Sequence, residues 1–346
     1  MRIGVLSYPM LFQRSGGLQV QVRETLQALN AAGLKARLVD PRRDSAAGYD
    51  LVHVFGSVHG NHRLVGAARA AGLPVGLSPL VPPAWTRLAG WRARWADRLA
   101  GAVGRQPHQS SYAQTRLALH QADRLIALAP AERDAITAGF LIAAEKISLI
   151  PNGIAPAFFA ADPAPFRAQT GIAGAFVLCV GAVSPYKNQL GLARALAGLA
   201  LPLVLIGPAA RAHADYLRQL TALPQVRWLG ALAHDDPLLA SAYAAARVLA
   251  LPSRGEVYPL AVLEALAAGT PAVMTADSAL VLPASAHALR RVRWDDAAAL
   301  AAAVQELLLA RPARAAVQAT VAELSWPRVA QQIAACYARC LDPHAP

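Results

Sequence analysis

Short apolar segments alternate with longer helical patterns along most of the chain, and this alternation restricts the fold more than any other feature. Residues 2–7, 36–40 and 50–55 are predicted strands, and a helix over about 18–32 connects the first two. The same order of strand and helix returns from Ala175 onward. Strands joined by helices pair in parallel, so the pattern predicts an α/β fold with doubly wound sheets.

A segment rich in Pro and Gly separates the two α/β patterns. It begins with Pro151-Asn152-Gly153 and ends with Pro163-Ala164-Pro165, a composition typical of linkers. At 346 residues the chain is long enough for two hydrophobic cores. We therefore predict a first domain over 1–155, a second over 156–325, and a final helical segment over 326–346.

The chain is strongly basic, with a formal net charge of +12 at pH 7. Lys occurs only at positions 35, 146 and 187, and all other cationic side chains apart from His are Arg. Since Ala is also abundant, we interpret this bias mainly as base composition. The charge would still favour an anionic membrane, a phosphorylated substrate or nucleic acid. No nucleic-acid-binding motif accompanies it, so we expect no nucleic-acid partner.

Cysteine usage and the absence of long apolar runs bear on localisation. Cys179, Cys336 and Cys340 have neither metal-ligand spacing nor an even disulfide framework, which favours a reducing cytosol. The first residues are too short an apolar run for a signal peptide, and no run of 18 apolar residues occurs. We expect a cytoplasmic protein, with peripheral attachment to the inner face of the membrane as an open alternative.

The segment over 83–104 combines aromatic and basic residues at helical spacing. An apolar stripe and a basic flank recur there, made of Leu88, Trp91, Trp95 and Leu99 and of Arg87, Arg94, Arg98 and Arg105. Tryptophan beside arginine is typical of a helix lying in the interface of an anionic membrane. The alternative, which the sequence slightly favours, is a core-facing helix whose arginines extend into water.

Two loops of the first half are weaker candidates for ligand sites. Gly16 and Gly17 precede the first long helix and either let a ligand approach the backbone or form a tight turn at positive φ. His59 and His62 follow the strand over 50–55, at the sheet edge where ligands of parallel sheets bind. Solvated histidines are the commoner explanation for such positions.

The stretch over 249–273 contains the strongest candidate site. A buried strand ends at Leu251, and Pro259 suits the first position of the next helix because it lacks an N–H. The amides of Leu260 and Ala261 are then free at the positive end of that helix, which favours anion binding.

Charged side chains surround this predicted helix start. Glu256 precedes it and Glu264 lies one turn inside, so two carboxylates flank the amides and could bind hydroxyl groups beside a phosphate. Lys187 follows the first strand of the second half; it is either a phosphate ligand or a surface lysine. No D-x-D triplet occurs, so we expect no metal. The pairs Asp235-Asp236 and Asp295-Asp296 are interpreted as turn or helix-start residues.

Taken together, these motifs resemble glycosyltransferase family 4. The E-x7-E motif corresponds to Glu256 and Glu264, and the likeness extends over nearly the whole chain. The other matching segments are the Gly-Gly loop at 16–17, Asp50-Leu-Val-His53, Ala122-Asp123, Ile150-Pro-Asn-Gly-Ile154, the 181–187 loop, Val226-x-Trp-Leu-Gly230 and Ser325-Trp326 with Tyr337.

The resemblance implies the GT-B fold, with two Rossmann-like domains facing across a cleft and a last helix returning to the first domain. It also implies a retaining, metal-independent glycosyltransferase without a cofactor. The donor would be a UDP- or GDP-sugar and the acceptor a glycan or a lipid-linked precursor in cell-envelope polysaccharide or lipopolysaccharide synthesis.

The same resemblance assigns roles to individual residues. Glu256 would hold donor-sugar hydroxyls and Glu264 the ribose, while Lys187 and the amides near Leu260 would bind the diphosphate. The nucleobase would lie near the loops after Gly207 and Gly230. The further donor-binding candidates are Tyr258, Pro259, Ala261, Leu232, Gly16 and Gly17.

Three departures from the family pattern concern mainly the phosphate end. Ala182 stands where the family has a phosphate-binding arginine, Val257-Tyr258-Pro259 replaces Gly-Phe-Gly, and Ser78-Pro79 replaces a histidine. A charge-assisted contact contributes about 1.5–3 kcal/mol, so its loss would weaken donor binding unless another group, such as Arg254, compensates. The open alternatives are a catalytically degenerate GT-B module acting as a scaffold, and a GT-B sugar phosphorylase or sucrose-type enzyme.

Overall fold

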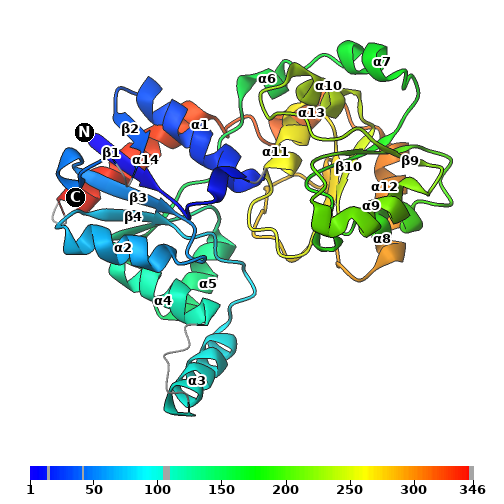
Figure 1. Cartoon of the computed structure of the whole chain (residues 1–346). Coiled ribbons are helices and arrows are strands. Elements are labelled where there is room, and N and C mark those ends of the chain that lie inside the picture. Colours follow the sequence, from blue (N-terminus) through cyan, green and yellow to red (C-terminus); the bar gives the residue numbers. More distant parts are fainter. Residues whose placement is uncertain (14–15, 41–42, 104–109, 343–346) are drawn as a thin grey trace. The chain divides into compact units, whose positions relative to one another are not determined.

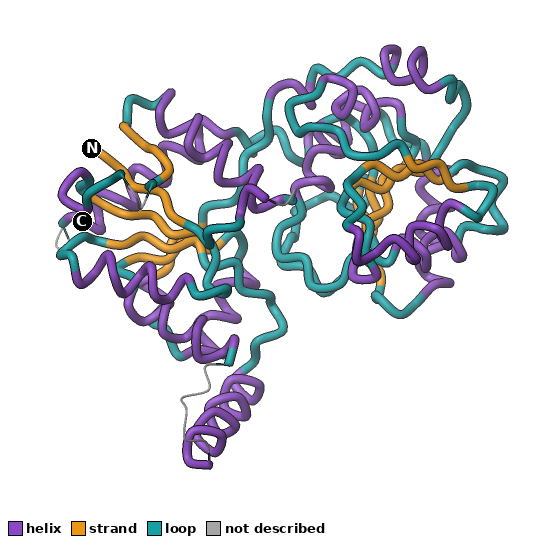
Figure 2. Tube along the Cα trace, viewed as in Figure 1, coloured by secondary structure: helices purple, strands orange, loops and turns teal. Residues whose placement is uncertain are grey.

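The computed structural model describes residues 1–13, 16–40, 43–103 and 110–342. The chain divides into two compact units. The first unit consists of Met1–Arg14, Leu18–Gly153 and Trp326–Pro346, and the second of Ser15–Gly17 and Ile154–Ser325. Each contains one six-stranded parallel sheet with helices packed on both of its faces (Figure 1; Figure 2). The predicted α/β class with two Rossmann-like sheets is confirmed.

The sheet of the first unit has the strand order β2-β1-β3-β4-β5-β6. Its strands are β1 (Arg2–Leu6), β2 (Lys35–Leu38), β3 (Leu51–Phe55), β4 (Val75–Ser78), β5 (Arg124–Ala127) and β6 (Ile147–Leu149). Its helices are α1 (Gly17–Ala31), α2 (Asn61–Ala70), α3 (Arg87–Val103), α4 (Ser111–Gln121), α5 (Pro130–Phe140) and α14 (Trp326–Leu341).

The sheet of the second unit has the order β12-β11-β10-β7-β8-β9. Its strands are β7 (Val177–Val180), β8 (Leu203–Ile206), β9 (Val226–Trp228), β10 (Val248–Leu251), β11 (Ala272–Thr275) and β12 (Leu289–Val292). Its helices are α6 (Pro156–Phe159), α7 (Ala164–Thr170), α8 (Gln189–Ala195), α9 (Ala214–Thr221), α10 (Pro237–Ala245), α11 (Leu260–Ala267), α12 (Ala297–Ala310) and α13 (Arg314–Ala319).

Helices cover both faces of the first unit's sheet, so the central strands are buried on both sides. All five residues of β3 are buried, as parallel sheets require. Helices α1 and α14 contribute to the core on one face, and α2, α4 and α5 to the core on the other. In the second unit, α8, α9 and α12 share one core with the strands.

Helix α14 completes the core of the first unit although it follows the whole second unit in sequence. Seven of its residues are buried at the three- and four-residue spacing of one helical face, namely Trp326, Val329, Ala330, Ile333, Cys336, Tyr337 and Cys340. Gly153 allows the close approach at its start, because a Cβ there would lie 2.5 Å from the amide nitrogen of Trp326.

A buried polar chain joins α14 to the sheet. His53 Nδ1 lies 2.7 Å from the hydroxyl of Tyr337, and His53 Nε2 lies 2.9 Å from the hydroxyl of Ser78. All three side chains are almost completely buried. Burial lowers the pKa of His53 to about 3, so its imidazole is neutral at physiological pH. Ser78, which stands where the sequence resemblance led us to expect a histidine, is therefore a partner of His53.

The structure contradicts the prediction of a core-facing stripe on α3. Leu88, Trp91, Trp95 and Leu99 are 46–61% exposed. The helix instead contacts α5 through its small residues, since a Cβ on Gly90 would lie 2.0 Å from the carbonyl oxygen of Gly139.

Helix α3 extends away from the rest of its unit (Figure 1). Residue 104 and Arg105, which we had included in this helix, lie outside the described residues. None of the helices in the described part of the chain combines the length and apolar character needed to span a membrane.

Some elements were not predicted from the sequence. Helix α4 and strand β12 have weak patterns, because both contain several polar or basic residues. Helix α2 begins at Asn61, which places His62 in its first turn, not in the preceding loop.

We predict that Tyr337→Phe weakens the attachment of α14. The substitution leaves the buried Nδ1 of His53 without its partner, which costs about 1–3 kcal/mol. Hydrogen exchange of β3 and β4 amides measures the effect in the first unit alone. Tyr8→Phe, at a partly buried tyrosine that packs against the same core, is the matched control. Equal protection in the two variants would contradict the prediction.

Candidate functional site

The carboxyl ends of β7 and β10 meet at the point where the strand order of the second unit reverses. These strands are hydrogen-bonded neighbours, but β8 and β9 continue on one side and β11 and β12 on the other. Ligands of open α/β sheets bind at such a switch point, beyond the carboxyl ends of the strands. The loops that leave these two strands are residues 181–188 and 252–259.

Two glycines let the backbone after β7 approach the backbone after β8. Gly181 and Gly207 have φ of 151° and 153°, and a Cβ on Gly207 would lie 2.0 Å from the carbonyl oxygen of Gly181. The amide of Val183 donates to the carbonyl of Pro208 at 2.8 Å. Buried Gln189 holds the same loop by donating to the carbonyl of Ala182. The loop is thus fixed from both sides.

Lys187 and Glu256, each on one of these loops, form an ion pair. Their side chains are 22% and 18% exposed, so Lys187 is not a free surface lysine. The Lys187 side chain also passes Gly181, where a Cβ would lie 3.5 Å from its Cε. Two of the residues predicted for the site are therefore brought together, although 69 residues separate them in sequence.

Hydrogen bonds to a neighbouring loop fix the backbone around Glu256. The amide of Gly255 donates to Asp277 at 2.7 Å, and the amide of Ala279 donates to the carbonyl of Val257 at 3.0 Å. Ser253 is fully buried, and its hydroxyl has no partner within the described residues. The segment that carries Glu256 is thus held in place on several sides.

Pro259 is not the first helical residue that we predicted. It is the N-cap of α11, with ψ of 112°, and the helix begins at Leu260. Its carbonyl accepts from the amides of Val262 and Leu263. The amides of Leu260 and Ala261 take part in no hydrogen bond between described residues, as expected at a helix start. The predicted pair of free donors is therefore present.

Glu264 lies in α11 and is buried, with both carboxylate oxygens paired. Its Oε2 accepts from the hydroxyl of Tyr243 at 2.8 Å, and its Oε1 lies 2.9 Å from Nε2 of His234. Burial and the Glu264 charge raise the pKa of Tyr243 well above its ordinary value. Phe158 contacts the rings of both His234 and Tyr243.

His234 was missed by the sequence analysis. It lies in the loop after Gly230, where the nucleobase was expected, and its side chain is 20% exposed. Leu232 in the same loop is partly buried. A histidine in an ordinary polar loop gave no signal, because its partner Glu264 is 30 residues away.

Other predicted residues have different surroundings. The guanidinium of Arg254 lies over the ring of Trp294, at 5.2 Å, so the structure records another partner for the group that we had suggested as a substitute for the missing arginine. Tyr258 is partly buried, and burial raises its pKa.

The loops of the first unit differ in part from their predictions. Gly17 is the first residue of α1, so the turn at positive φ is not formed there, and Gly16 directly precedes it. His59 is exposed, whereas His62 is 7% exposed and its Nδ1 has no partner among the described residues. The prediction of a solvated His62 is therefore wrong.

One member of each acidic pair lies at a helix start, as predicted. Asp236 accepts from the amide of Leu238 at the start of α10, and Asp296 accepts from that of Ala299 at the start of α12. In the part of the chain that the structure describes, no three His, Cys, Asp or Glu side chains gather as a metal site would require.

Comparisons with known proteins find a family likeness within the second unit. Residues 174–310 match the family model for glycosyl transferases group 1. A D-inositol 3-phosphate glycosyltransferase from Kineococcus radiotolerans is 37% identical over 175 residues, which cover 45% of this chain and 40% of that protein. A glycogen synthase from Mycobacterium tuberculosis is 31% identical over 275 residues, which cover 75% of this chain and 63% of that protein. The chain thus spans less than two thirds of either relative.

A solved structure matches the fold over the whole chain. The Anabaena protein HepE, in complex with UDP-glucose, is 20% identical with a TM-score of 0.69, covering 98% of this chain and 99% of that one. The expected GT-B fold is confirmed.

We predict that Gly207→Ala destabilises the second unit by about 3 kcal/mol, because the new Cβ meets the carbonyl of Gly181 at a φ unfavourable for alanine. Urea denaturation combined with hydrogen exchange of β7 and β8 measures the change. Gly198→Ala is the control, since its Cβ would meet no atom within 4 Å. A Gly207→Ala protein that unfolds at the wild-type urea concentration would show that the loop can move away.

Proposed function

We propose that the chain is a group 1 glycosyl transferase, and that it is a retaining, metal-independent hexosyltransferase that uses a UDP- or GDP-sugar; the family match over residues 174–310 supports this. The observation that carries this proposal is the ion pair of Lys187 and Glu256 beside the free amides at the start of α11. An ammonium and two amides suit a diphosphate, and a carboxylate suits sugar hydroxyls. The site therefore has groups for both halves of a nucleotide sugar.

We infer that binding of the donor separates the ion pair of Lys187 and Glu256 and gives each side chain a new partner. The donor's diphosphate takes Lys187 as a charge-assisted contact, and Glu256 is released to accept hydrogen bonds from the transferred sugar. Neither group is left without a hydrogen-bonding partner at any stage, which limits the cost of a partly buried ion. Lys187 and the α11 amides are then in place to stabilise the departing diphosphate as its negative charge grows.

Glu264 suits the ribose. Its carboxylate is held rigidly by the buried hydroxyl of Tyr243, while the partner on its other oxygen, His234, is the more exposed of the two. A ribose hydroxyl can donate to Glu264 in place of His234 or beside it. Since His234 belongs to the loop proposed for the nucleobase, ribose and base recognition share one polar cluster.

The acceptor is proposed to be a glycan or a lipid-linked precursor of a cell-envelope polysaccharide, at a cytoplasmic membrane surface. The exposed stripe of α3 supports the membrane contact. Trp91 and Trp95 lie next to each other on it, at 6.1 Å between ring centroids, and Arg98 lies over Trp95. Exposed aromatic rings with neighbouring arginines fit the headgroup region of an anionic bilayer. The basic side chains supply the charge complementarity.

Calorimetric titration with UDP, GDP and their sugars tests the donor site. We expect one nucleotide to bind, and Lys187→Met to weaken it by a factor of about ten to one hundred, because one charge-assisted phosphate contact is lost. Lys35→Met, at an exposed lysine of the first unit, changes the same charge and should leave binding unaltered.

Glu256→Gln should abolish sugar transfer yet retain nucleoside diphosphate binding. Nucleotide binding without any transfer by the wild-type chain would instead support a scaffold.

Sedimentation with vesicles tests the membrane contact. We expect binding to vesicles containing phosphatidylglycerol that weakens as salt is raised, because the arginine contribution is screened. The double variant Trp91→Ala/Trp95→Ala should lose binding without loss of stability, since both rings are exposed. Leu309→Ala, at an exposed leucine of α12, is the control. Salt-independent binding, or none, would contradict the proposal.

A further inference from the structure

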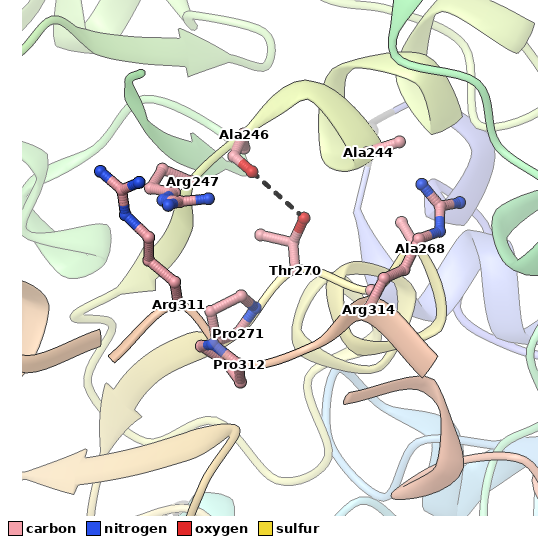
Figure 3. A pocket seen from close by; sticks show the side chains of 10 residues that line it. Ala244, Ala246, Arg247, Ala268, Thr270, Pro271, Arg311, Pro312 and Arg314 are labelled. Carbon is pink, nitrogen blue, oxygen red and sulfur yellow. Dashed lines mark hydrogen bonds between the residues drawn. The ribbon is translucent and has the colours of Figure 1, made fainter. Parts of the chain in front are cut away.

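A pocket of about 240 Å³ lies at the edge of the second unit's sheet opposite the site described above (Figure 3). Arg247 stands directly before β10, and Thr270 and Pro271 stand directly before β11, so the pocket is at the amino ends of these strands. Arg311 and Arg314 complete its charged lining. Three arginines thus line one hollow, Arg247 from just before β10 and the other two from the connection between α12 and the start of α13.

No carboxylate neutralises this cluster. The ten residues that line the pocket include no Asp or Glu, and the ion pairs between described residues involve none of the three arginines. Arg247 and Arg311 lie close together (Figure 3). Burial and the neighbouring Arg311 charge lower the pKa of Arg247, which identifies the two guanidiniums as mutually repelling. Such an arrangement is stabilised by an anion between them.

Helix ends offer a simpler explanation, which accounts for only part of the cluster. Helices α10, α11 and α12 end near the pocket, and arginines favour the carbonyls at helix C-termini. Arg314 has a backbone partner of another kind, since it donates to the carbonyl of Ala161. The guanidiniums of Arg247 and Arg311 donate to no carbonyl within the described residues. Their presence needs another reason.

The backbone at Arg311 adopts a conformation that is uncommon for a residue with a side chain. This residue caps α12 in the left-handed conformation, with φ of 45° and ψ of 58°. Glycine adopts that conformation at no steric cost, and Gly171 does so at the end of α7. Leu141 caps α5 in the same conformation, so the backbone alone does not select an arginine; among the non-glycine residues recorded at positive φ, Arg311 is the one that lines the pocket.

We propose that this pocket binds the phosphate group of a small phosphorylated metabolite, separately from the donor site. Guanidinium forks match phosphate oxygens in pairs, and Arg247 and Arg311 supply two of them; the buried hydroxyl of Thr270 beside them already donates to the carbonyl of Tyr243 at 2.6 Å. The volume exceeds the space of a single water, about 30 Å³, by a wide margin. The ligand can therefore carry an organic group beyond its phosphate.

The pocket is connected to the donor site through α11 and β10. Helix α11 presents its first turn and Glu264 to the donor site, and Gly269, two residues beyond its last residue, lines the pocket. Strand β10 starts after Arg247 and ends before Ser253 and Glu256. A phosphate bound between the arginines fixes the ends of both elements, which makes the pocket suited to an effector of the donor site.

Calorimetry with inorganic phosphate, a hexose monophosphate and a nucleoside monophosphate tests this inference, at constant ionic strength maintained with chloride. We use Lys187→Met as the background, so that the donor site contributes no lysine. At least one of the three probes should bind to the Lys187→Met protein with the same affinity as to the wild-type chain. Arg247→Gln and Arg311→Gly should each weaken that binding about tenfold or more, because each removes a charge-assisted contact. The probe that binds most tightly identifies the source of the phosphate.

Two controls separate the inference from general effects. Arg227→Gln removes one charge at an exposed position of β9 and should leave phosphate affinity unchanged. Arg311→Gly also replaces a strained residue by glycine, so its melting temperature without phosphate should be equal to or above that of the wild type. The inference is overturned if no probe binds, if the pocket variants bind phosphate like the background, or if Lys187→Met alone removes all binding.

Discussion

The parallel pairing of β7 with β10 is the constraint on which the proposed site depends. These strands are adjacent in the sheet although β8 and β9 lie between them in sequence, and their carboxyl ends therefore open onto the same edge. Lys187 follows one and Glu256 follows the other, so their ion pair is a direct result of the strand order. The rigidity of the two loops, through Gly181 and Gly207 on one side and Asp277 on the other, keeps the charges in register.

The sequence predicted those parts of the molecule that local patterns determine. The two α/β halves followed from the alternation of strands and helices, and α14 lies within the final helical segment predicted over 326–346. The interest of Glu256 and Glu264 came from their position around a helix start, which also predicted the free amides of Leu260 and Ala261. Each of these predictions depends on residues that are close together in sequence.

Features set by packing between distant segments could not be predicted in this way. The link between His234 and Glu264 joins a loop to a helix, and neither residue type signals the other. Helix α3 has two faces at helical spacing, one of tryptophans and one of small residues. The sequence cannot show that α3 packs against α5 through its small residues and leaves its tryptophans exposed, because this depends on the close contact of Gly90 with Gly139.

The position of α14 affects the order in which the two units can fold during synthesis. Ribosomes generally release domains from the N-terminal end, and each folds once its residues have emerged. Here the core of the first unit includes Trp326 and Tyr337, which are synthesised after the whole of the second unit. The second unit can therefore fold first, while the earlier part of the chain waits, with its α14-facing surface exposed, for the last helix.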